Sequence, residues 1–502
     1  MQPRAKSESD LVDSALLAGT GRLGSSETFT LTKERQDAII STVSWRILPV
    51  CFWMTFFCFV DRTNLGLAAD SFCRDIGINN AQYGTGVGLL FLGYALFQIP
   101  SNIVLYKVGA PLWLGFILTF WGVVALSMAF VTNVQGFYFL RFMLGVAESG
   151  AFPGMWFYFT RFFPENRLTL PYTITELGVK LSQVVAAPFA AALLSLGGFL
   201  AIKDWQWLFF LEGLPPIFLG FYIWYSFPKD PKTAKWLTQE ESTWLMNEIA
   251  LKGTDNHKNE WGLGLFPQIK EVVKLPGLWV VTLIKFLKDM TTNFCLFWTP
   301  LMIETLLDGR SLHKVIDHGG TCAASQEGDS HHSTVEIGLL TGVPFLVAVC
   351  VGIANGWHSQ RVGERRLHMG ILYMVGAVLF ALLPVLTKVG GSWGVVLGIV
   401  CLTGGIAGSL GGQGILISLA TSYACSSKAV GLAVFNSFSN FGGYIGPQIT
   451  GYILQRQKTY TPAILFLAGT FFLSGVIGAC LRDPLQSRKN TPTETDETEE
   501  AL

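Results

Sequence analysis

Residues 45–66 read WRILPVCFWMTFFCFVDRTNLG, an apolar run that ends in two neighbouring charges, Asp61 and Arg62. A mostly apolar run of about 18 residues or more is long enough to cross a bilayer as a helix. A charge at membrane depth costs a few kcal/mol or more, so it persists where it lines a cavity or pairs with another charge. The stretch therefore predicts a membrane helix that carries a polar site near one end.

A second apolar stretch repeats this pattern, because Arg141 and Glu148 lie inside it, seven residues apart. Seven residues are close to two helical turns, so the two side chains are expected to share one helix face. These four charges indicate a cavity for a charged solute within a bundle of membrane helices.

The composition supports a protein surrounded by a lipid bilayer. Of the 502 residues, 50% are hydrophobic and 14% are charged, whereas soluble domains carry about 25% charged residues. The formal net charge is zero, so no basic field exists for a nucleic-acid partner. No Ser-His-Asp set, HExxH motif or P-loop is present, which speaks against an enzyme.

The apolar runs and their polar breaks predict an all-α membrane protein with about twelve transmembrane helices in two pseudo-symmetric six-helix halves. The expected spans are 45–66, 81–107, 112–132, 135–158, 171–197, 205–227, 277–306, 336–357, 368–387, 393–423, 429–454 and 461–481. The predicted domains are a disordered tail (1–44), an N-terminal half (45–227), a polar linker (228–276), a C-terminal half (277–482) and an acidic tail (483–502).

Lys and Arg concentrate in the tails, the linker and the loops of one side, which predicts that both termini are cytosolic. The first forty residues lack the layout of a cleaved signal peptide. We expect a monomer in the plasma membrane, with an organelle membrane as the alternative.

The loop 308–335 is unusually long and holds Cys322 and four histidines, His313, His318, His331 and His332. The spacings fit no standard metal site, so a solvated loop is predicted, with a pH- or metal-responsive loop as the alternative. Cys73 and Cys322 are expected on the same side of the membrane, and whether they form a disulfide stays open.

Five motifs, in the right order and the right halves, resemble the anion:cation symporter family of the major facilitator superfamily over about residues 45–482. They are Gln98-Ile-Pro-Ser-Asn102, Arg141-x3-Gly145-x2-Glu148, Trp205-x-Trp-Leu-Phe-x2-Glu212, Trp357-x-Ser359-x-Arg361-x3-Arg365-Arg366 and Asn436-Ser-x2-Asn440. The resemblance implies the major facilitator fold and transport by alternating access.

The resemblance also implies roles for single residues. Arg62 matches a position that faces the central cavity, Tyr94 matches one whose hydroxyl touches substrate, and Lys288 stands where vesicular glutamate transporters carry an arginine. Asn436 and Asn440 offer amide groups to a polar ligand from the second half. These five are the predicted substrate ligands, with Lys288 expected to hold the second carboxylate of a dianion. Their alternatives are internal contacts: Arg62 could pair with Asp61 or Glu148, Lys288 could pair with Asp289 or reach the membrane interface, and the two asparagines could join helices.

Asp61 and Glu148 are the predicted proton carriers, with Arg141 as their partner. A buried carboxyl beside an arginine is ionised and takes a proton when it loses that partner. The alternative is a permanent Arg141–Glu148 pair that only stiffens the helix. Lys285 is expected to reach towards the cytosolic interface.

The second-half gating motif carries Gln360 where the family usually has an aspartate. Gating contacts are therefore expected to involve Arg361, Arg365 and Arg366 with Glu212 or Glu364.

The predicted function is proton-coupled symport of a small organic anion, a carboxylate, with the proton as coupling ion and no cofactor or metal. One alternative is a sodium-coupled or uncoupled carrier of phosphate or another anion. An alternative of another class is a non-transporting membrane sensor.

Overall fold

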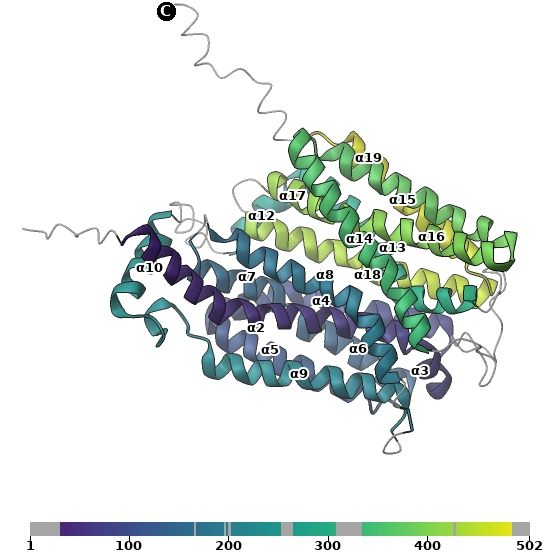
Figure 1. Cartoon of the computed structure of the whole chain (residues 1–502), viewed down its shortest axis with the longest axis horizontal. Coiled ribbons are helices and arrows are strands. Elements are labelled where there is room, and N and C mark those ends of the chain that lie inside the picture. Colours follow the sequence, from purple (N-terminus) through teal and green to yellow (C-terminus); the bar gives the residue numbers. More distant parts are fainter. Residues whose placement is uncertain are drawn as a thin grey trace, which may run out of the picture.

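The computed structural model describes residues 31–164, 167–194, 197–198, 202–252, 265–307, 334–424 and 428–483. In this part of the chain the regular structure is helical, and the helices form two groups (Figure 1). The first group, drawn from purple to teal, comprises α2 (Lys33–Leu67), α3 (Ala69–Ile76), α4 (Asn80–Val108), α5 (Ala110–Met128), α6 (Val134–Glu148), α7 (Ala151–Phe162), α8 (Thr169–Leu194) and α9 (Asp204–Ser226).

The second group comprises α13 (Pro276–Leu307), α14 (Thr334–Val362), α15 (Arg366–Leu386), α16 (Gly391–Gly411), α17 (Gln413–Tyr423), α18 (Lys428–Gln457) and α19 (Thr461–Cys480). Between the groups lie α10 (Gln239–Lys252) and α12 (Leu265–Val273). The architecture is the all-helical one that the apolar runs predict.

Nine helices of the described residues are long and apolar enough to cross a membrane. The other three predicted spans, 135–158, 277–306 and 429–454, correspond to α6 with α7, to α13 and to α18. Helices α6 and α7 are only 15 and 12 residues long, whereas α13 and α18 are longer but carry charged and polar side chains along their length. They are also the helices in which most of the predicted site residues lie.

Three element boundaries differ from the expected ones. The first helix begins at Lys33 rather than 45, because ion pairs Arg35–Glu241 (3.2 Å) and Arg167–Asp37 (2.6 Å) hold its first turns. The span 135–158 is interrupted at Ser149 and Gly150, just before Pro153, whose ring cannot continue the hydrogen-bond ladder. The span 393–423 divides at Gly412 into α16 and α17.

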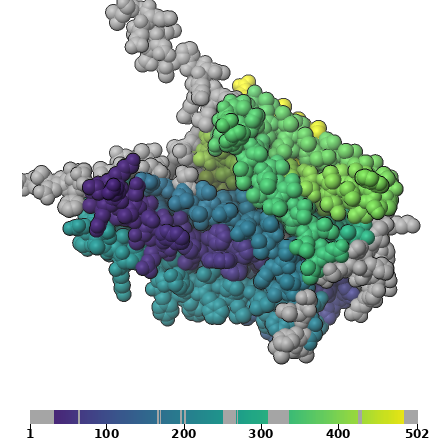
Figure 2. Space-filling view, viewed as in Figure 1, coloured from purple at the N-terminus to yellow at the C-terminus, as the bar shows by residue number. Residues whose placement is uncertain are grey.

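The two groups meet along three helix pairs, α4 with α18, α8 with α14 and α2 with α13. Figure 2 shows the boundary where blue α8 lies against green α14. We call the end of the bundle that carries α10 and the start of α2 the linker end, and the opposite end the far end.

Close backbone approaches join the two groups towards the far end. A Cβ atom added at Gly84 of α4 would lie 2.4 Å from the carbonyl oxygen of Pro447 in α18. A Cβ atom added at Gly451 of α18 would lie 2.3 Å from the carbonyl oxygen of Asn80 in α4. A Cβ atom added at Gly338 of α14 would lie 2.8 Å from the carbonyl oxygen of Ala187 in α8. Glycine is required where backbones come this close, so these positions define a tight seal between the two groups.

Cys73, in the short helix α3, is disulfide-bonded. Cys322 and the histidine-containing loop lie outside the described residues, except for the loop's last two positions, 334–335. The expected acidic tail also lies outside them, apart from Asp483, which is buried.

A buried charge cluster as the candidate functional site

The centre of the first group holds an ion pair between Arg62 of α2 and Glu148 of α6. Arg62 donates from Nε (2.9 Å) and from Nη2 (2.5 Å), and both bonds end on the same oxygen, Oε2 of Glu148. The Cys58 thiol lies 3.5 Å from that oxygen. The sequence leaves open whether Arg62 pairs with Asp61 or with Glu148, and the structure shows the pair with Glu148. The second carboxylate oxygen of Glu148, Oε1, has no hydrogen-bond partner in the described chain.

Aromatic rings surround the Arg62 guanidinium. Its central carbon lies 5.1 Å from the ring centre of Phe59, 5.2 Å from that of Tyr94 and 6.0 Å from that of Phe91. A guanidinium over an aromatic face gains a favourable cation–π interaction. The ring of Tyr94 thus lies beside the Arg62 guanidinium, and its role as a substrate ligand stays a prediction.

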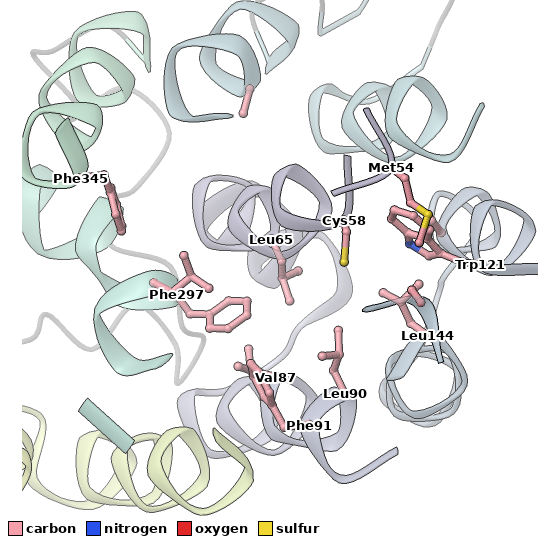
Figure 3. Close-up of a cluster of buried hydrophobic side chains, with 14 of the residues drawn as sticks. Met54, Cys58, Leu65, Val87, Leu90, Phe91, Trp121, Leu144, Phe297 and Phe345 are labelled. Atoms are coloured by element: carbon pink, nitrogen blue, oxygen red, sulfur yellow. The ribbon is translucent and has the colours of Figure 1, made fainter. Parts of the chain in front are cut away.

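A cluster of buried apolar side chains (Figure 3) includes residues that contact these charges, among them Cys58, Phe91 and Trp121. Side chains from four helices of the first group converge with Phe297 of α13 from the second group: Met54, Cys58, Leu65, Val87, Leu90, Phe91, Trp121 and Leu144. In such surroundings charges interact more strongly than in water, and an unpaired charge is costly.

Asp61 and Arg141 lie in the same buried region. Oδ2 of Asp61 accepts a hydrogen bond from Nε1 of Trp121 in α5 (3.4 Å), a partner that the sequence patterns did not single out. Arg141 is fully buried, and its guanidinium carbon lies 5.8 Å from the ring centre of Phe297. Arg141 and Glu148 do share a buried helix face, but no Arg141–Glu148 hydrogen bond forms, so the permanent pair considered above is absent from the described structure.

A third carboxyl belongs to this region, that of Glu212 in α9. It is 3% exposed, and neither of its oxygens has a hydrogen-bond partner among the residues described. The carboxyl of Asp61 is within electrostatic reach of it. Glu212 therefore lies with the predicted proton carriers, and the expectation that it contacts the gating arginines is wrong.

The second group has its own charge cluster on α13. Lys288 donates to Oδ1 of Asp289 (2.9 Å) and to Oε1 of Gln413 (2.6 Å), and Lys285 pairs with Oδ2 of the same aspartate. Lys285 is buried, so the prediction that it reaches the membrane interface is wrong; the carboxylate of Asp289 one turn away holds it inside. Two ammonium groups share one carboxylate, which leaves one positive charge in excess.

The predicted amide ligands on α18 lie beside the boundary between the groups. Nδ2 of Asn440 donates to the backbone oxygen of Asn436 (2.7 Å), and both residues are half-buried. Between these two positions in the sequence, Ser437 donates to Oε1 of Gln98 in α4 (2.8 Å). This bond joins α4 and α18, and the sequence patterns had not assigned it.

The gating motif forms a network at the linker end. Arg365 donates two hydrogen bonds to Asp483, from Nε (2.9 Å) and Nη2 (2.5 Å), and others to Ser418 and Ser422 of α17. Glu364 accepts from the backbone N–H groups of Leu367 and His368. Arg361 instead stacks on Trp357 at 3.9 Å. Glu364 also pairs with Arg366 (3.6 Å), as one of the two alternatives expected, whereas the carboxyl that binds Arg365 is that of Asp483.

No group of three or more His, Cys, Asp or Glu side chains that could hold a metal ion occurs in the part of the chain that the structure describes. The histidines of the long loop lie outside it.

Comparison with known proteins shows which family this chain belongs to. The model of the Major Facilitator Superfamily matches residues 51–313 and 319–501. A putative tartrate transporter of Agrobacterium vitis is 31% identical over 456 residues, covering 90% of this chain and 93% of the relative. A putative metabolite transport protein of Pseudomonas putida is 29% identical, covering 90% and 96%.

Solved structures show the same fold. A bacterial homologue of the human lysosomal transporter Spinster, inward-facing and unoccupied, has a TM-score of 0.64 at 15% identity, covering 90% of this chain and 99% of that one. A D-xylose–proton symporter has a TM-score of 0.63 at 13% identity, covering 87% and 97%. The chain belongs to the Major Facilitator Superfamily and is a multi-pass membrane transporter, not an enzyme.

Proposed function

We propose that the protein is a symporter of the anion:cation type that carries a small carboxylate together with protons by alternating access. The names of the relatives support an organic anion, since two of them are described as putative tartrate transporters. The observation that carries the proposal is the Arg62–Glu148 pair, in which one guanidinium fork is occupied by one carboxylate oxygen.

The pair can couple substrate to proton by competition. The planar fork of an arginine is suited to bind one carboxylate in two places. When the carboxylate of a substrate takes this place, Glu148 loses its cation among buried apolar side chains, where an ionised carboxylate without a partner costs several kcal/mol. A proton on Glu148 removes that cost, so substrate and proton bind together.

The charge cluster on α13 offers a place for a second carboxylate. Lys288 shares Asp289 with Lys285, and the excess positive charge can attract an anion to the second group while Arg62 holds the first carboxylate. Two cationic sites on opposite sides of the boundary suit a dianion such as a dicarboxylate.

The tight seal at the far end supports one orientation of the cycle. If the linker is cytosolic, as the Lys and Arg distribution predicts, these close contacts lie on the outer side and this state is closed to the outside. Binding of substrate and proton would allow the two groups to rock and open the far end. A plasma-membrane location and a monomeric state fit this scheme and remain proposals.

The test is uptake by purified protein in liposomes under an imposed pH gradient, with tartrate, other dicarboxylates, monocarboxylates, sugar acids and phosphate as substrates. We expect accumulation of a carboxylate that depends on the inward proton gradient. Glu148→Gln should abolish gradient-driven accumulation while exchange of labelled for unlabelled substrate continues, because glutamine mimics the protonated acid.

Other outcomes would select the alternatives. Accumulation that follows a sodium gradient would identify a sodium-coupled carrier. Equilibration without any coupling ion would identify an uncoupled carrier. Transport of neutral sugars but of no anion would contradict the role of Arg62, and no transport of any solute would favour the sensor.

A further inference from the structure

Glu212 is the one carboxyl of the first charge cluster, among the residues described, for which no cation is within reach. Arg62 is paired with Glu148. Arg141 has Asp61 and Glu148 within electrostatic reach. Three carboxyls thus face two guanidiniums, and the charged group within reach of Glu212 is another carboxyl, that of Asp61.

Backbone packing brings Glu212 to the level of the bundle at which Asp61 lies. The helices α5 and α9 touch at Gly122 and Gly213, where a Cβ atom on Gly122 would lie 2.6 Å from the carbonyl oxygen of Gly213. Glu212 precedes Gly213, and Trp121 precedes Gly122. The Trp121 indole donates to Asp61, so the three side chains are brought to the same level of the bundle.

The elements packed against α9 add no other compensating charge at this level. Helix α5 carries no Asp, Glu, Lys or Arg, and α2 contributes Asp61 and Arg62. Helix α8 contributes Glu176 and Lys180, which are four residues apart and within electrostatic reach of each other. Helix α3 contributes charges at the far end, Asp70 and Arg74, which pair, and Asp75, which pairs with Lys203.

The unpartnered carboxyl oxygens of this region indicate that a proton is bound there. Both oxygens of Glu212, Oδ1 of Asp61 and Oε1 of Glu148 are buried without a hydrogen-bond partner in the described chain. A buried carboxylate without a cation or donors costs several kcal/mol, and binding a proton is the simplest way to remove its charge. A carboxylic acid also gains an O–H donor, which the neighbouring carboxylate oxygen can accept.

We propose that Glu212 holds a proton in the resting protein and exchanges it with Asp61, which makes Glu212 a third proton-binding carboxyl of the symporter. In the transfer, the O–H bond of Glu212 breaks and one forms on Asp61, so Glu212 becomes a carboxylate and the total charge is unchanged. Asp61 is also within electrostatic reach of Glu148. The order Glu212, Asp61, Glu148 therefore connects this store to the pair that binds substrate, and this last step rests on the proposed function.

Infrared spectroscopy of the purified, substrate-free protein at neutral pH tests the proposal. A protonated buried carboxyl has a C=O stretching band distinct from those of carboxylates and amides, and the band shifts in D2O. We expect Glu212→Gln to lose such a band that the parent protein shows. Glu240→Gln, which removes an exposed carboxylate on α10, should leave it unchanged.

A parent protein without the band, or a band that Glu212→Gln leaves in place, overturns the proposal. Should Glu212→Gln fail to fold, Glu212→Asp keeps the acid and is expected to move the band, whereas an unmoved band overturns the proposal in the same way. The measurement needs no substrate or gradient. A failure of proton-driven uptake with the band confirmed would therefore reject the symport function and leave the protonated Glu212 standing.

Discussion

At the scale of single residues, the geometry of Arg62 explains why an arginine and not a lysine occupies this position. Two of its nitrogens donate to one oxygen of Glu148 while three aromatic rings surround the guanidinium. A planar fork can satisfy both contacts at once, whereas an ammonium donates from a single nitrogen.

Arg62→Lys should therefore weaken substrate binding while keeping the charge. Loss of one charge-assisted hydrogen bond costs about 1.5–3 kcal/mol, or about tenfold to a hundredfold in affinity. Tartrate-dependent thermal stabilisation of the detergent-solubilised variant measures this. Arg456→Lys, which changes an exposed arginine at the end of α18, serves as the control. Equal affinities of Arg62→Lys and the parent protein would remove Arg62 from the binding site.

Glu364 lies in the loop between α14 and α15 and caps the start of α15. Although partial burial acts in the opposite direction, hydrogen bonds from the backbone of Leu367 and from His368 hold the pKa of Glu364 below its usual value. The ionised form is the stabilising one, so its contribution is present at neutral pH and is lost as the pH falls through the lowered pKa.

Glu364→Gln should accordingly destabilise the protein at neutral pH by about 1 kcal/mol, the usual value of a helix cap. The difference in unfolding free energy from the parent protein should shrink under acidic conditions, where Glu364 is protonated in both the folded and the unfolded state. Thermal unfolding of both proteins over a pH series checks this. A difference that grows as the pH falls would contradict the sign of the pKa shift.

At the scale of the elements, the apolar runs predicted the helices. The spans that carry the predicted site residues matched the apolar pattern of a membrane helix less well than the others. The charges of α13 and the amides of α18 lower the apolar character that marks an ordinary span. Their positions along the helices could be predicted, but their partners could not. Gln413 lies 125 positions from Lys288 in sequence, and Trp121 lies 60 positions from Asp61.

The second charge cluster leads to a prediction about substrate charge. Lys288→Met removes one ammonium and leaves Lys285 with Asp289, so the excess positive charge of α13 disappears. Uptake of a dicarboxylate should fall by about tenfold or more, the effect of losing one hydrogen bond to a charged group, while a monocarboxylate is affected less. Competition between the two anions in liposomes measures the ratio. An unchanged ratio would place the second carboxylate elsewhere.

The glycine contacts at the far end predict a shift between conformations. Gly84→Ala would place a Cβ atom 2.4 Å from the backbone of α18, whereas at Gly356 of α14 no atom lies within 4 Å of an added Cβ. Overpacking costs about 1–3 kcal/mol, which should shift the population away from the state closed at the far end. Spin-label distances across the far end should lengthen for Gly84→Ala and remain unchanged for Gly356→Ala. Lengthening in both variants would show that the seal is not specific.

At the scale of the whole molecule, the sequence motifs predicted two groups of helices around charged residues but not which charges pair. Arg141 and Glu148 are seven residues apart on one helix, and this spacing left open a pair between them, beside the alternative pair of Glu148 with Arg62. In the fold Glu148 lies against Arg62, 86 residues away in sequence. Glu212 was one of two alternative partners for the gating arginines, because sequence spacing does not show that α9 packs on α5 and α2.

The Arg62–Glu148 pair also predicts that protons do not cross without substrate. Protonation of Glu148 in the empty protein would leave the buried Arg62 without its counter-charge, a state that costs several kcal/mol. Each 1.4 kcal/mol lowers its population tenfold, so empty transporters should rarely reorient with a proton bound. In liposomes with a trapped pH-sensitive dye, an imposed gradient should acidify the lumen no faster than in protein-free liposomes. Addition of a transported carboxylate should then start proton entry. A steady proton leak in the absence of substrate would show that Arg62 does not enforce coupling.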